Sequence, residues 1–348
     1  MKVLITGNLG YVGSVLCGFL TRECPGVELI GLDSGFFGHC VTEPTSYPER
    51  ALKIQYFADV RDVKTNILEG VDALVHLAAI SNDPMGNEFE GVTQDINELA
   101  TINLARMAVK AGVKHFVFAS SCSMYGAASG AAKREEDTLN PLTAYAKSKV
   151  NVEKVVAEMN LEKMAFTSLR FATACGWSPR LRLDLVLNDF VACAIASKKI
   201  TVLSDGSPWR PLIDVEDMCR AIAWGISRRA DVGGQFLAVN AGSKVGNFQV
   251  KDLARAVASV LEGTTISINS NALPDSRSYM VDFSLYERLA PEHQPQVTLH
   301  ESITRIATGL RSIGFNNPEF RNSIYMRLNT LRLHLSAGAL SNQLRWNS

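Results

Sequence analysis

The sequence predicts an α/β protein built on a doubly wound parallel sheet, with a smaller C-terminal lobe. Short runs of β-branched and apolar residues alternate with longer amphipathic stretches through the first half of the chain, which is the pattern of βαβ units. A glycine-rich loop directly follows the first apolar run, and an aspartate ends the second. These three observations point to the same sheet architecture.

Six strands are expected from six short β-branched or apolar runs, which cover residues 2–6, 28–33, 54–58, 73–77, 115–120 and 165–171. Helices are expected at 11–23, 91–111 and 144–160, where the periodic stretches are too long for strands. After Phe171 the alternation loosens into helices near 184–196, 215–227 and 250–261, an irregular region at 269–279, and one more strand at 234–239. The tail from Asn316 has a basic and apolar helical pattern that predicts a packing helix.

This order of elements predicts two interleaved domains. Residues 1–173 are expected to form the larger domain, with its sheet completed by part of 212–245. Residues 174–348 are expected to form mainly the smaller lobe.

Composition argues against several classes of protein. Lys plus Arg equals Asp plus Glu at 35 each among 348 residues, so no broad basic surface for nucleic acid is expected. The seven cysteines form no Cys-x-x-Cys pair and the six histidines are dispersed, so neither a disulfide framework nor a metal site is expected. The first apolar run is too short for a signal peptide and no segment reaches membrane-spanning length. A cytoplasmic protein without a membrane partner is the expectation.

The glycine loop predicts a dinucleotide site. Gly7, Gly10 and Gly13 follow a strand and open a helix, a context in which backbone N–H groups and the helix dipole stabilise a pyrophosphate. An ordinary tight turn is the alternative for such glycines taken alone. Asp33 follows the last glycine at the spacing of a carboxylate that binds ribose hydroxyls. Because Asp33 would repel a 2′-phosphate and residues 34–39 contain no Lys or Arg, NAD is expected rather than NADP.

Three further residues predict proton-transfer chemistry. Tyr145 and Lys149 are four residues apart at the start of a predicted helix, so they share one helix face. A nearby ammonium and a cationic nicotinamide would both favour the phenolate, whose ordinary pKa of about 10 is high for a base. Ser121, at the end of the fifth predicted strand, would hydrogen-bond the same substrate oxygen. Each residue alone has an ordinary structural interpretation; their order along the chain makes the set specific.

The chain resembles the extended short-chain dehydrogenase/reductase family, in its nucleotide-sugar epimerase/dehydratase branch. Besides the glycine loop and the Ser121, Tyr145 and Lys149 set, the resemblance rests on several segments: His76-Leu-Ala-Ala79, Asn97 with Asn103-Leu104, residues 169–173 and residues 209–217. It implies a Rossmann-type sheet, NAD as cofactor and a nucleotide-sugar substrate. It also implies a homodimer packed through helices 91–111 and 144–160.

The resemblance and the motifs together suggest two sets of contacts. Cofactor contacts are expected at Gly7, Gly10, Tyr11, Val12, Gly13, Asp33, Asp59, Val60, Leu77, Ala78, Ala79, Tyr145 and Lys149. Substrate contacts are expected at Ser121, Cys122, Ser123, Thr173, Asp184, Asn188, Arg210 and Arg277. The two arginines would bind the nucleotide diphosphate, because a guanidinium matches a phosphate bidentately; a surface side chain is the alternative for Arg277.

The residues after Ser121 bear on the type of reaction. Relatives that eliminate water or decarboxylate typically carry acids there, whereas this chain has Cys122 and Ser123. Relatives that epimerise C3 and C5 place a cysteine at the position of Ser123, and a shift of one residue reverses the side-chain direction. Cys122 is therefore expected to be packed.

An NAD-dependent nucleotide-sugar epimerase that transiently oxidises C4 is accordingly expected. The alternatives are an NAD(P)H-dependent 4-keto-sugar-nucleotide reductase, a C3/C5 epimerase and a catalytically silent NAD-binding sensor. Neither the nucleotide nor the sugar follows from the sequence.

Overall fold

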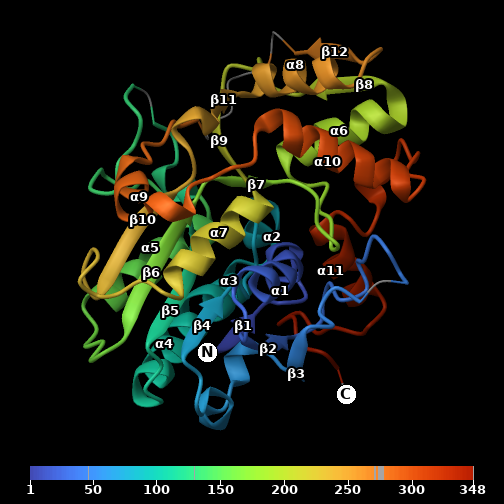
Figure 1. Ribbon diagram of the computed structural model, residues 1–348. Coiled ribbons are helices and arrows are strands. Elements are labelled where there is room, and N and C mark those ends of the chain that lie inside the picture. The colour runs from blue at the N-terminus through green and yellow to red at the C-terminus, as the bar shows by residue number, and fades with distance from the viewer. Residues whose placement is uncertain (46, 129, 270–271, 273–277, 348) are drawn as a thin grey trace.

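A seven-stranded parallel sheet forms the centre of the computed structural model, which describes residues 1–348 except 46, 129, 270–271, 273–277 and 348 (Figure 1). The strand order is β10-β6-β5-β4-β1-β2-β3. The strands are β1 (Lys2–Thr6), β2 (Glu28–Asp33), β3 (Leu52–Phe57), β4 (Ala73–His76), β5 (His115–Ser121), β6 (Ala165–Phe171) and β10 (Phe236–Ala241). This arrangement confirms the predicted fold class.

Burial explains where the strands form. The β6 side chains are all buried and β4 is likewise fully buried, as expected for parallel strands covered on both faces. β3, at one edge, is at most half-buried. β10 follows several elements of the smaller lobe, yet it pairs in parallel with β6 and forms the other edge of the sheet.

Helices cover both faces of this sheet. One face packs against α1 (Tyr11–Glu23) and α7 (Val215–Gly225), which contact each other and share one apolar core. The opposite face packs against α4 (Ala100–Lys110) and α5 (Ala144–Ala157), whose buried side chains belong to a second core.

The helix expected at 91–111 is not an α-helix throughout. It consists of α3 (Glu90–Gln94), a π-helical turn η3 (Asp95–Leu99) and α4. Within the π turn, the Asn97 amide accepts a hydrogen bond from the Ile80 N–H at 2.8 Å and donates one to the Ile80 carbonyl at 2.9 Å. π turns of this kind occur frequently at functional sites, and this one fixes the loop that follows β4.

A third core lies in the smaller lobe, at the top of Figure 1. Its helices are α6 (Val186–Ser197), α8 (Val250–Val260) and α10 (Leu299–Ser312), and α10 was not anticipated from the sequence. Its strands are β8 (Lys199–Val202) paired with β12 (Thr265–Ile268), and β11 (Asn247–Gln249), β9 (Trp209–Asp214) and β7 (Thr173–Cys175) in a three-stranded sheet.

The C-terminal tail returns to the larger domain. After α11 (Arg327–Ser336), the indole N–H of Trp346 donates to the Ser34 carbonyl at 2.6 Å, just beyond β2. The Arg61 guanidinium donates to the carbonyls of Gln343 and Leu344 at 2.8 and 3.0 Å. The tail thus borders the ends of β2 and β3. Across the described part of the chain, no helix combines the length and apolarity needed to cross a bilayer.

Candidate active site

A cavity of about 920 Å³ opens at the carboxyl ends of the central strands and extends beneath the smaller lobe. It lies beside the junction of β1 and β4, where the strand order reverses, and such switch points bind ligands in open α/β sheets. Its lining includes every residue expected to contact the cofactor: Gly7, Gly10, Tyr11, Val12, Gly13, Asp33, Asp59, Val60, Leu77, Ala78, Ala79, Tyr145 and Lys149.

The glycine loop packs so closely against backbone atoms of the protein that no larger residue fits at Gly7 or Gly13. Gly7 has a φ of +77°, and a Cβ there would lie 2.6 Å from the Ala78 nitrogen. A Cβ on Gly13 would lie 2.5 Å from the Gly7 carbonyl oxygen. α1 starts after Gly10 without a side-chain cap, so the N–H groups of its first turn are available to an anion. This cradle fits a dinucleotide pyrophosphate.

Asp33 is held in place by two backbone donors. One carboxylate oxygen accepts the Leu9 N–H at 3.1 Å and the other accepts the Gly35 N–H at 2.7 Å. Burial raises the pKa of Asp33, and these hydrogen bonds oppose the rise. The carboxylate therefore has a fixed orientation at the end of β2, where it fits a ribose diol.

Asp59 and Val60 border the cavity, but the Asp59 carboxylate is already bound. Arg61 approaches it with two guanidinium nitrogens, at 2.6 and 2.9 Å. Burial favours the neutral acid, yet the Arg61 contacts outweigh it and lower the pKa of Asp59. Any contact between Asp59 and the cofactor would therefore come from atoms other than this carboxylate.

Ser121, Tyr145 and Lys149 meet on the far side of the cavity. Burial raises the pKa of Tyr145 to about 12, against a hydrogen bond from the Ser121 hydroxyl that lowers it. Lys149 donates to the Ala119 carbonyl at 2.7 Å, and its nitrogen lies 5.6 Å from the centre of the Tyr145 ring. Burial lowers the pKa of Lys149 to about 7.

A buried ion pair anchors the helix that carries Tyr145 and Lys149. Glu153, one turn further along α5, pairs with Arg170 of β6 at 2.7 Å. The same carboxylate accepts hydrogen bonds from Ser120 and Ser168, each at 2.7 Å. Because these partners lie on β5 and β6, the network fixes α5 against the two strands and limits movement of the catalytic side chains.

The expected substrate residues divide into three groups. Ser121, Ser123, Thr173, Asp184 and Arg210 line the cavity. The Ser123 hydroxyl is buried and has no hydrogen-bond partner among the described residues.

Cys122 and Asn188 do not line the cavity. The Cys122 thiol donates to the Arg170 carbonyl at 3.0 Å, and burial raises its pKa. The Asn188 amide is fully buried and bonds to the backbone of Gly176 and Arg182. Neither side chain reaches substrate space, because each is turned into the protein interior. Arg277 lies outside the described residues.

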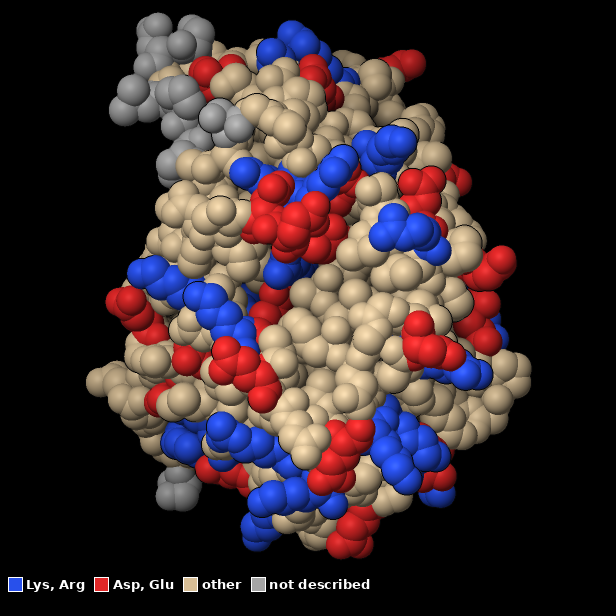
Figure 2. All heavy atoms as spheres, turned by 90° about the vertical axis from the view of Figure 1, so that its left-hand side faces the viewer, with Lys and Arg blue, Asp and Glu red and all other residues tan. Residues whose placement is uncertain are grey.

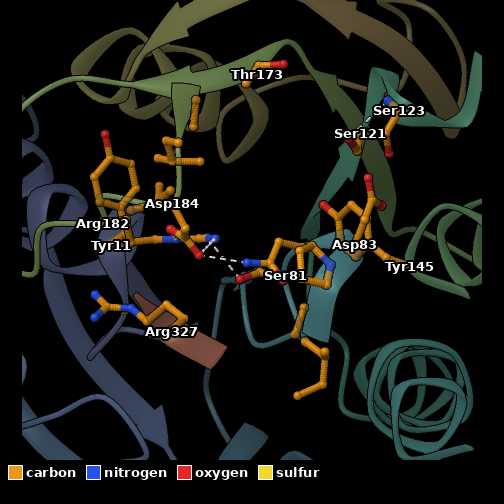
Figure 3. A pocket seen from close by; sticks show the side chains of 18 of the residues that line it. Tyr11, Ser81, Asp83, Ser121, Ser123, Tyr145, Thr173, Arg182, Asp184 and Arg327 are labelled. Carbon is orange, nitrogen blue, oxygen red and sulfur yellow. Dashed lines mark hydrogen bonds and ion pairs between the residues drawn. The ribbon is translucent and has the colours of Figure 1, made fainter. Parts of the chain in front are cut away.

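The sequence reasoning missed a polar bridge across the middle of the cavity. Arg182 pairs with Asp184 through two bonds of 2.8 and 2.9 Å and donates to the Ser81 hydroxyl at 3.0 Å. Asn82 donates to the same Asp184 carboxylate at 2.7 Å. Figure 3 shows this bridge between Tyr11 on one side and Ser121 with Tyr145 on the other. Charged residues alternate with leucines from Arg180 to Asp184, and this pattern was the available signal.

Asp83 is a second missed residue. It lines the cavity at the start of α2 (Asp83–Glu88), accepts the Thr143 hydroxyl at 2.7 Å, and lies near enough to Tyr145 to raise its pKa. An acid was expected only directly after Ser121, whereas this carboxylate comes from the loop after β4. Within the described ranges, no three His, Cys, Asp or Glu side chains gather as a metal site requires.

Comparison with known proteins agrees with this geometry. A model of the NAD dependent epimerase/dehydratase family matches residues 3–242. The uncharacterized UDP-glucose epimerase YtcB of Bacillus subtilis is 25% identical over 333 residues, covering 90% of this chain and 99% of that protein. The UDP-glucose 4-epimerase of Lactobacillus helveticus is 28% identical over 240 residues, 64% of this chain and 70% of its own.

The fold is also shared with solved structures. A UDP-glucose-4-epimerase from Stenotrophomonas maltophila, with bound NAD and formylated UDP-arabinopyranose, superposes with a TM-score of 0.77 at 21% identity, covering 90% of this chain and 99% of that one. Because the family model spans most of the chain and the glycine cradle and Asp33 fit its cofactor, the chain belongs to the NAD-dependent epimerase/dehydratase family and is an NAD-dependent enzyme.

Proposed function

We propose that the protein epimerises the sugar of a nucleotide sugar by reversible oxidation at C4. The observation that carries this proposal is the contact of Ser121 with Tyr145 beside Lys149, in the cavity that the glycine loop also lines. Relatives named for UDP-glucose and UDP-glucuronate 4-epimerases support the substrate class, so UDP sugars come first in a substrate panel.

In this mechanism the chain's own residues manage the proton. Bound NAD supplies a hydride acceptor that later returns the hydride. Ser121 hydrogen-bonds the C4 oxygen, and Tyr145 takes the hydroxyl proton as the C4 ketone forms, then gives it back when the ketone is reduced on its other face. A cationic nicotinamide would offset the burial that raises the pKa of Tyr145. Ser123, whose hydroxyl has no partner among the residues that the structure describes, would bind a sugar hydroxyl.

A second candidate is a reaction that removes a carbon-bound proton after C4 oxidation, as in a dehydratase. Asp83 favours it, because this carboxylate lines the cavity near Tyr145. Cys122 does not, since its thiol faces the Arg170 carbonyl. The two candidates differ in whether solvent hydrogen enters carbon.

The test is an isotope experiment with a C4-deuterated UDP sugar, analysed by NMR. Epimerisation predicts that the product keeps its deuterium at C4, that no solvent label enters carbon and that no net NADH is consumed. Solvent label at C3 or C5, or elimination of water, would refute the C4 proposal in favour of a carbon-acid mechanism. Stoichiometric NADH consumption with a 4-keto substrate would identify a reductase, and NAD binding without turnover of any nucleotide sugar would indicate a sensor.

We further propose that the two domains bind different ligands. Residues 1–173 together with β10 would bind NAD, and most of residues 174–348 would bind the sugar nucleotide. Arg210 and Asp184 enter the cavity from the second group. The seven cysteines all carry free thiols, which suits work in the reducing cytoplasm.

A homodimer through the face formed by η3, α4 and α5 is also proposed. Leu99 and Val155 lie on these elements and are 48% and 37% exposed. On the side of the molecule where α5 lies in Figure 1, Figure 2 shows a broad area without charged side chains between groups of mixed sign. Exposed apolar side chains such as Leu99 and Val155, in an area with few charges, are typical of an interface.

A further inference from the structure

Arg327 is a buried cation in the cavity wall that the proposed reaction does not use. It begins α11, is 1% exposed and lines the cavity. It also lies far outside residues 3–242, which the family model matches, so family membership assigns it no role.

Arg327 lies in a cluster of buried charges but, in the described chain, has no carboxylate bonded to it. The guanidinium groups of Arg180 and Arg182 and the Asp184 carboxylate all influence it. Glu49 pairs with Arg180, and Asp184 pairs with Arg182. Among the described residues Arg327 forms no ion pair. Burial lowers its pKa to about 10, so it is still charged at neutral pH.

A second buried arginine shows how this protein satisfies such a group for structural purposes. Arg228 forms no ion pair among the described residues and lies away from the cavity. It donates to the Thr167 hydroxyl and to the carbonyl oxygens of Phe166, Val232, Gly234 and Gln235, all within 3.2 Å.

Arg327 is much less fully bonded. Its only close acceptor in the described chain is the Arg180 carbonyl at 2.8 Å, with the Ile324 carbonyl at 3.4 Å. A guanidinium carries five N–H donors. Most of them therefore remain for a ligand.

The surroundings of Arg327 identify the ligand's chemistry. Its guanidinium lies 5.0 Å above the Phe37 ring, in the loop that follows Asp33. In Figure 3 it lies on the same side of the cavity as Tyr11 of the glycine loop, away from Ser121 and Tyr145. We propose that Arg327 binds the pyrophosphate of NAD, opposite the glycine loop, through the N–H groups that the described chain leaves without an acceptor.

The test measures binding rather than turnover. NAD-free Arg327→Met protein should bind NAD at least about tenfold more weakly, because a charge-assisted bond to phosphate is lost. Adenosine, which lacks phosphate, and UDP, which carries the substrate's diphosphate, should bind as they do to the wild type. Titration calorimetry with these three ligands gives the affinities.

Two further variants keep the result interpretable. Arg332→Met removes a cation from the same helix that is already paired with Glu88, and it should leave NAD affinity unchanged. Arg327→Lys keeps the positive charge but loses the two-pronged geometry of the guanidinium. Its affinity for NAD should lie between that of Arg327→Met and that of the wild type. Because Met removes a buried charge that forms no ion pair in the described chain, the ligand-free melting temperature should not fall.

Unchanged NAD affinity in Arg327→Met would overturn the proposal. Equal losses for adenosine and NAD would overturn it too, since the arginine would then merely shape the pocket. A loss confined to UDP would assign Arg327 to the sugar nucleotide's diphosphate instead, and would likewise refute the NAD contact.

Discussion

Replacing Asp33 by alanine and Ser34 by arginine should reverse the preference for NAD over NADP. The Asp33 carboxylate is fixed by the N–H groups of Leu9 and Gly35, so it cannot turn away from a 2′-phosphate. Ser34 lines the cavity beside it, and its carbonyl, rather than its hydroxyl, accepts the indole N–H of Trp346. Its side chain can therefore be exchanged without breaking that contact with the tail.

The magnitude follows from the bonds exchanged. A hydrogen bond to a charged group contributes about 1.5–3 kcal/mol, so NAD should lose about 10- to 150-fold in affinity. An arginine bound to the 2′-phosphate should return a similar amount to NADP. The ratio of the two dissociation constants should then change by about 10²–10⁴.

Titration of NAD-free protein with NADH and NADPH, followed by nicotinamide fluorescence, measures both constants. Ser34→Arg alone should keep the preference for NADH, because Asp33 still repels the phosphate. An unchanged ratio in the double variant would refute the assignment of Asp33 to the ribose.

Three other predictions concern catalysis, acid stability and assembly. Tyr145→Phe should lower kcat by about 10²–10⁴ and barely change substrate binding, whereas Tyr47→Phe, at an exposed site, should retain activity; near-normal turnover of Tyr145→Phe would exclude its role in proton transfer. Burial lowers the pKa of His76 to about 3, so the unfolded chain takes up a proton first as pH falls below about 6.5. His76 should therefore lower the free energy of unfolding by about 3 kcal/mol between about pH 7.5 and about pH 4.5. Urea unfolding of NAD-free His76→Gln should lack that component, and identical pH dependence in both proteins would contradict it. Leu99→Glu should shift the light-scattering mass of a dimer toward the 37.9 kDa monomer, and a wild-type monomer at micromolar concentration would refute the dimer.

The sequence predicted some strands to the residue and others only approximately. The limits of β1, β2 and β6 agree at both ends with the predictions, because their runs of residues are almost wholly buried. β3 starts two residues earlier than expected, since an edge strand that is half-exposed has no sharp apolar boundary. The π turn around Asn97 was invisible to a helical pattern, because it depends on a tertiary bond to Ile80.

The site shows a similar division. The glycine loop and Asp33 were recognisable because their spacing within one βαβ unit carries the geometry. Arg182 and Arg327 were not, since Ser81 and Phe37, which they contact, are separated from them by more than a hundred residues. Asp83 was overlooked for the same reason: it meets Tyr145 only once the loop after β4 folds against α5.

The late return of β10 to the sheet has a consequence for biosynthesis. Until residues 236–241 leave the ribosome, β6 presents an unpaired edge composed entirely of residues that are buried in the finished protein. Such edges template aggregation. A fragment that stops near residue 173 should therefore precipitate rather than fold, and a nascent chain of that length is where chaperones have most to shield.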